Sequence, residues 1–145
     1  MRWITRSRIH VDRVACPWLI RRFVDSQAEF IFVSRDQVAR IAAEQNAIPF
    51  DMPDVELGHH DGRCSFEAIM EKHGLNDPAL QRLARIVHAA DIAADLHTDI
   101  IAPGLEAIAK GFGVLIPDDA ANLEAQFRVY DALYAWCRLE VAART

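Results

Sequence analysis

The sequence predicts a mostly helical α+β domain, in which about five helices pack against a small sheet built from the N-terminal half. Apolar residues recur at helical spacing through most of the chain, whereas β-branched and aromatic runs are short and end before residue 58. The chain has 145 residues, of which 52% are hydrophobic, so it has the size and composition of one globular domain. Residues 1–145 are therefore expected to form a single domain.

Four short segments are predicted to be strands. The clearest is residues 29–33 (EFIFV), because it is rich in β-branched and aromatic side chains. Residues 2–5 (RWIT), a short segment with two apolar side chains, are a second candidate. Residues 48–50 and 55–57 are predicted as two more strands, separated by a turn at residues 51–54.

Prolines and capping residues predict the helix boundaries. Cys16 and Pro17 are expected to open a helix that runs to about residue 24, since proline suits the first helical position. Asp77 and Pro78 have the same form and predict a helix to about residue 91. Further helices are expected over residues 34–45, 65–74 and 118–141, with a short one over residues 103–110.

The net charge of −5 is unevenly distributed. Residues 1–22 hold six arginines and one acid, so the rest of the chain is acidic, which argues against sequence-independent DNA binding. Guanidinium groups bind oxyanions through paired hydrogen bonds. We therefore hypothesise an anion site formed by Arg6, Arg13, Arg21 and Arg22. The alternative is that these arginines are surface charges paired with nearby acids.

Cys16 is the candidate catalytic or redox-active residue. At the predicted helix start, with arginines nearby, its thiolate form would be favoured. The alternative is a small buried side chain that packs the helix. Three scattered cysteines do not form a disulfide scaffold, and they fit a reducing cytoplasm.

A candidate metal site combines imidazole, thiolate and carboxylate groups. His59 and Cys64 flank a loop that Gly62 allows to turn sharply, and Asp91 ends a predicted helix. These ligand types suit a zinc-like divalent ion, with His60 or His88 as a candidate fourth ligand. The alternative is a set of exposed loop histidines and a hydrogen-bonded carboxylate.

Several classes of function lose support. The sequence contains no glycine-rich phosphate loop, so no nucleotide cofactor is expected. It has no apolar run long enough to span a membrane and no recognisable signal peptide, so a cytoplasmic protein is expected.

The run DRVACPWLIRRF at residues 12–23, together with CSF at 64–66, DPAL at 77–80 and YDALYAW at 130–136, resembles the C-terminal domain of the ChrB chromate-resistance family. The resemblance implies a bacterial cytoplasmic protein that responds to chromate and helps to control a chromate efflux transporter. Regulators of this family carry a further N-terminal domain that this sequence lacks, so direct control of DNA is not expected. The family motif carries over onto Arg6, Asp12, Arg13, Cys16, Arg21, Arg22, His59, Cys64 and Asp91.

Three functions remain open at this point. The first is binding or sensing of an oxyanion of the chromate and sulfate class, with a divalent metal in a structural or regulatory role. The second is a metal-dependent redox or hydrolytic enzyme that uses Cys16 or the His/Cys/Asp site. The third is a partner-binding module, either as a homodimer or with a separate regulatory protein.

Overall fold

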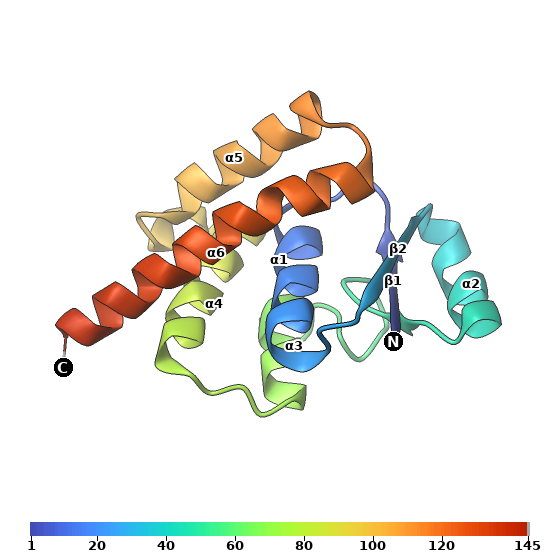
Figure 1. Cartoon of the computed structure of the whole chain (residues 1–145), viewed down its shortest axis with the longest axis horizontal. Coiled ribbons are helices and arrows are strands. Elements are labelled where there is room, and N and C mark those ends of the chain that lie inside the picture. Colours follow the sequence, from blue (N-terminus) through green and yellow to red (C-terminus); the bar gives the residue numbers. More distant parts are fainter. Residues whose placement is uncertain (145) are drawn as a thin grey trace.

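The computed structural model describes residues 1–144 and confirms a mostly helical α+β fold with a small sheet near the N-terminus (Figure 1). The α-helices and strands follow in the order β1 (Arg2–Arg6), α1 (Val11–Leu19), β2 (Glu29–Val33), α2 (Val38–Gln45), β3 (Ile48–Pro49), α3 (Ser65–Lys72), α4 (Pro78–Asp91), α5 (Ala102–Leu115) and α6 (Asp119–Ala143). A π-helix, η1 (Ile20–Val24), continues α1, and two 3₁₀-helices, η2 (Arg35–Gln37) and η3 (Ala93–Thr98), precede α2 and α5.

The three strands form a parallel sheet in the order β2-β1-β3. Successive side chains of a strand point to opposite faces of the sheet. The two faces of this sheet pack against different helices. Ile4 packs with Val38 and Ala47 under α2, whereas Trp3 belongs to the large core formed with the other helices. Figure 1 accordingly shows α2 on the side of the sheet away from α1. All three strands point their carboxyl ends to the same edge.

The predicted strand at residues 55–57 is wrong, because this segment closes a tight loop. Leu57 accepts a hydrogen bond from the Asp51 N–H group at 3.0 Å, and Val55 accepts one from Gly58 at 3.1 Å. Asp51 and Asp54 have positive φ angles of 49° and 62°, which aspartate tolerates better than most side chains. The loop therefore returns the chain to the end of β3.

Helix α1 begins earlier than predicted. It starts at Val11 rather than at Pro17, so Pro17 lies inside the helix and Cys16 lies in its sixth position. Proline cannot donate the usual hydrogen bond to the carbonyl four residues before it, and α1 passes into the π-helix η1 soon afterwards. Packing accounts for the earlier start, because nearly all of residues 11–20 are buried in the core.

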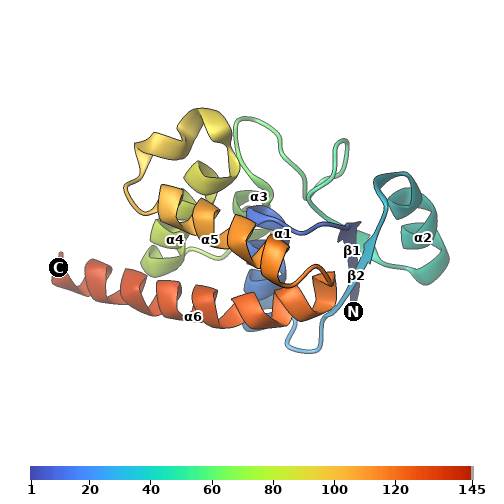
Figure 2. The same cartoon turned by 90° about the horizontal axis from the view of Figure 1, so that it is seen from above.

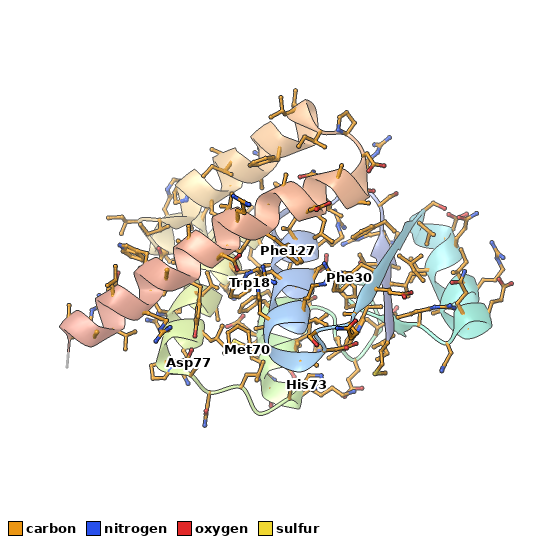
Figure 3. The ribbon with its side chains drawn as sticks, viewed as in Figure 1. Trp18, Phe30, Met70, His73, Asp77 and Phe127 are labelled. Carbon is orange, nitrogen blue, oxygen red and sulfur yellow. The ribbon has the colours of Figure 1, made fainter. Side chains whose placement is uncertain are left out.

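The long helix α6 packs across α1 and α4; Figure 2 shows it along one side of the molecule, and Figure 3 shows it crossing in front of these helices. Trp18 of α1 points toward α6, where its Nε1–H group donates to Asp131 at 2.7 Å (Figure 3). The Tyr130 hydroxyl group donates to the Val11 carbonyl at 3.3 Å. The first contact holds the end of α1, and the second holds its first turn, which carries Asp12.

Helix α5 is longer than predicted. It runs through Gly111 and Gly113 to Leu115, since an interior glycine costs a helix only about 1 kcal/mol and α5 recovers that cost by packing on α4. Within residues 1–144 none of the helices combines the length and the apolar character needed to cross a membrane.

Candidate functional site

Asp12 is a buried carboxylate held between two helices. It lies in the first turn of α1, and its oxygens accept hydrogen bonds from the first two N–H groups of α3, Ser65 at 2.8 Å and Phe66 at 3.2 Å. One turn along α1, the Cys16 thiol donates to Asp12 at 3.2 Å. Burial raises the pKa of Asp12 to about 6, even though its hydrogen bond with His59 acts to lower it.

Three aspartates surround one nitrogen of His59. Its Nε2 atom lies 3.2 Å from Asp12 Oδ2, 3.3 Å from Asp51 Oδ1 and 3.0 Å from Asp91 Oδ2. Hydrogen bonds with these carboxylates raise the pKa of His59 to about 12, and the hydrogen bond with Asp12 has the largest effect. A single ring N–H group cannot donate well to three acceptors at once.

The spacing of these atoms is also the spacing of ligands around a metal ion. Ligand atoms about 2.0–2.2 Å from an ion, at angles of about 90–109°, lie about 2.8–3.6 Å apart. The three distances around His59 fall in this range. The ligand atoms of Asp12, His59 and Asp91 all lie within 4.8 Å of one another. This cluster, together with Asp51, is called the aspartate–histidine site below.

The tight loop of residues 51–58 brings Asp51 and His59 to this site. Asp51 follows β3, and its Oδ1 atom accepts a hydrogen bond from the Ser65 hydroxyl group at 3.1 Å. Gly58, the last residue of this loop, packs closely on the backbone of Met52, and an added Cβ atom would be 2.2 Å from the Met52 carbonyl oxygen. Only glycine fits at this position, directly before His59. Asp91 lies at the end of α4, and its Oδ1 atom accepts a hydrogen bond from the Asp12 N–H group at 3.3 Å.

Two of the four predicted anion-binding arginines lie beside the aspartate–histidine site. Arg13 Nη1 is 3.8 Å from Asp51 Oδ2, and Arg6 lines a cavity with Asp51 and His59. The Nε atoms of Arg6 and Arg13 are buried and have no hydrogen-bond partner among residues 1–144. Buried polar groups are nearly always paired in folded proteins, so these two N–H groups are unused donors beside the aspartate–histidine site.

The other two predicted arginines lie elsewhere and already have partners. Arg21 donates to the Ala28 carbonyl at 2.8 Å and lies over the Phe127 ring. Arg22 forms a bidentate ion pair with Asp131, in which both hydrogen bonds are 3.0 Å long. The structure thus divides the arginine cluster between the carboxyl edge of the sheet and the surface of α6.

The cavity at the aspartate–histidine site has a volume of about 230 Å³ and is lined by Arg6, Asp51, Met52, Pro53 and His59. Arg6 ends β1 and Asp51 follows β3, so the cavity lies at the carboxyl edge of the parallel strands. Ligands of open parallel sheets commonly bind at this edge.

The predicted metal ligands are divided between two groups. His59 and Asp91 meet in the aspartate–histidine site, whereas Cys64 and His88 lie in a separate group with Glu67. The ring of His60 is nearly half exposed, and its Nε2 atom is 2.8 Å from the Glu56 carbonyl oxygen.

Sequence reasoning did not assign Asp12 and Asp51 to the metal site. A signal for each was present in the sequence. Asp12 is the only acid in an otherwise basic and apolar segment, and a lone acid there indicates a specific partner. Asp51 directly follows a predicted strand, where side chains at the carboxyl edge of a sheet converge.

The structural argument for Cys16 as a reactive thiol is wrong. Cys16 is fully buried in the middle of α1, not at a helix start. Burial raises the pKa of the Cys16 thiol well above its ordinary value, and the nearby negative charge of Asp12 is the second cause of this increase. The thiol instead donates a hydrogen bond to Asp12.

Alkylation of Cys16 in the native protein is therefore expected to be at least about 100-fold slower than in the denatured protein, because the thiol reacts only when the core opens. Iodoacetamide labelling followed by peptide mass spectrometry measures this ratio for each cysteine. Cys137, which is also buried but lies on the outer helix α6, serves as an internal comparison. Rapid native labelling of Cys16 would contradict the buried position.

Together, the fold and the site define a small helical α+β domain with a carboxylate–imidazole cluster at the carboxyl edge of a parallel sheet. The chain belongs to the ChrB C-terminal domain family, whose model, described as "ChrB, C-terminal domain", matches residues 3–137. The chain is similar to "Protein ChrB" of Cupriavidus metallidurans, with 36% identity over 133 residues. These residues make up 91% of this chain and 39% of that relative, so the chain spans about two fifths of its length. No solved structure matches the chain.

Proposed function

We propose that this domain serves chromate resistance by binding a tetrahedral oxyanion of the chromate and sulfate class beside a divalent metal ion. The observation that carries the proposal is the placement of two unpartnered arginine N–H groups next to the aspartate–histidine site. Membership of the ChrB C-terminal domain family supports the link to chromate.

The residues of the aspartate–histidine site fit a divalent ion. Asp12, Asp91 and His59 offer two carboxylates and one imidazole, and Asp51 offers a third carboxylate. A mainly oxygen-ligand set with one imidazole suits ions such as Mn²⁺, Fe²⁺ and Zn²⁺. The two α3 N–H groups that hold Asp12 act as the outer hydrogen bonds that orient a metal ligand.

The metal ion explains how an oxyanion can bind beside three carboxylates. Arg6, Arg13 and a protonated His59 only neutralise the three aspartates. A divalent ion replaces the proton of His59, so the metal-loaded site carries a net positive charge and attracts a dianion. The cavity of about 230 Å³ has room for a tetrahedral oxyanion together with several waters.

Titration calorimetry with sulfate, which does not oxidise thiols, tests the proposal on Mn²⁺-loaded and chelator-treated protein. Sulfate is expected to bind the loaded protein, and removal of the metal is expected to weaken binding at least tenfold. Arg6→Ala should weaken binding about 10- to 100-fold, since a charge-assisted hydrogen bond contributes about 1.5–3 kcal/mol.

Arg22→Ala is the matched control, because Arg22 is paired with Asp131 away from the cavity. Its sulfate affinity is expected to equal that of the wild type. Chromate can then replace sulfate in the same experiment. Equal losses in Arg6→Ala and Arg22→Ala, or no sulfate binding by metal-loaded protein at low salt, would contradict the proposed function.

A further inference from the structure

We infer that Cys64, Glu67 and His88 form a second metal site, which takes a thiophilic divalent ion of the zinc class and links α3 to α4. The Cys64 Sγ atom, a Glu67 carboxylate oxygen and a His88 ring nitrogen all lie within 4.8 Å of one another. This inference does not depend on the proposed function, because none of the three residues belongs to the aspartate–histidine site.

The three side chains come from two helices that converge. Cys64 directly precedes α3 and is fully buried, and Glu67 lies in the first turn of that helix. His88 lies in the last turn of α4, with Nδ1 at 2.7 Å from Glu67 Oε1. The same Glu67 oxygen accepts the Cys64 N–H group at 3.0 Å, so the carboxylate is fixed between its two neighbours.

Asp95 of η3 provides an independent indication of a metal ligand. The second ring nitrogen of His88, Nε2, lies 2.7 Å from Asp95 Oδ2. A histidine that binds a metal through one ring nitrogen almost always donates the other N–H group to a carboxylate or carbonyl. Asp95 thus directs Nδ1 of His88 toward Glu67 and Cys64.

The thiol distinguishes the ion of this site from that of the aspartate–histidine site. Thiolate, imidazole and carboxylate together suit Zn²⁺, which three protein ligands can hold with a fourth position free. A cavity of about 390 Å³, lined by Glu67, Arg85, His88, Thr98 and Asp99, adjoins the cluster and gives that position access to solvent.

Co²⁺, which replaces Zn²⁺ and absorbs light when bound to thiolate, is the probe. Titration of the chelator-treated full chain is expected to produce a thiolate-to-cobalt charge-transfer band that Zn²⁺ then abolishes. Zn²⁺ should also raise the melting temperature by roughly 5–10 °C at a free concentration of about 100 times its Kd. Cys64→Ser should remove the band, and His88→Ala should weaken Co²⁺ binding at least tenfold.

Cys137→Ser and Asp91→Asn are the matched controls, since they remove another thiol and a ligand of the other site. Both are expected to keep the band. Circular dichroism establishes that each variant is folded, and Glu67→Gln, which preserves side-chain shape, provides a further test through at least tenfold weaker Co²⁺ binding. Absence of the band in the wild type, or its persistence in Cys64→Ser, would overturn the inference.

Discussion

Replacement of Asp12 by alanine is expected to lower the free energy of unfolding by about 3–5 kcal/mol, the largest effect of any single change at the site. The substitution leaves the Ser65 and Phe66 N–H groups without their acceptor in the core. An unsatisfied buried donor costs about 1–3 kcal/mol. Urea denaturation followed by circular dichroism measures the loss.

Asp36→Ala is the control for loss of a negative charge, because Asp36 is exposed in η2. Its effect is expected to stay within about 0.5 kcal/mol. Asp12→Asn keeps one carbonyl acceptor, so its loss in the free energy of unfolding should lie between the losses of the two alanine variants. If Asp12→Ala and Asp36→Ala unfolded at the same urea concentration, Asp12 could not be the residue that joins α1 to α3.

Gly58→Ala is expected to weaken Mn²⁺ binding at the aspartate–histidine site at least tenfold and to lower the free energy of unfolding by about 1–3 kcal/mol. A Cβ atom at this position would lie 2.2 Å from the Met52 carbonyl oxygen, so the loop backbone must move. His59 follows Gly58 directly, and its Nε2 atom would leave the three carboxylates. Calorimetry and urea denaturation measure the two effects.

Gly111→Ala is the matched control for the same chemical change. A Cβ atom on Gly111 meets no atom within 4 Å, and the residue lies inside α5. The substitution is expected to raise the free energy of unfolding by about 0.5–1 kcal/mol and to leave Mn²⁺ binding unchanged. Full Mn²⁺ affinity in Gly58→Ala would show that the tight loop does not position His59.

Local patterns predicted much of the fold. The strand at residues 29–33 and the helix opened by Asp77 and Pro78 agree with the structure, because β-branched runs and N-terminal caps act within a few residues. The errors occurred where distant packing overrode a local signal. Pro17 stays inside α1 because the helix is buried on most of its surface.

The candidate site was predicted in part. His59, Asp91 and Cys64 were selected by chemical type, but spacing along the chain could not show that they belong to two groups. Asp12 and Asp51 lie 39 residues apart in the sequence and meet through α3, which donates to both, and around His59 Nε2. A contact of this kind depends on where a third element packs.

The sequence by itself determined the helical α+β class, the residue types of the site and the family to which the chain belongs. These properties depend on hydrophobic periodicity, on side-chain chemistry and on sequence similarity to the family. Only the tertiary structure decided that Arg6 lines the cavity, that Cys16 is buried, and that three aspartates surround His59. The physical reason is that burial and the convergence of charged groups follow from the packing of helices far apart in sequence, which no local pattern specifies.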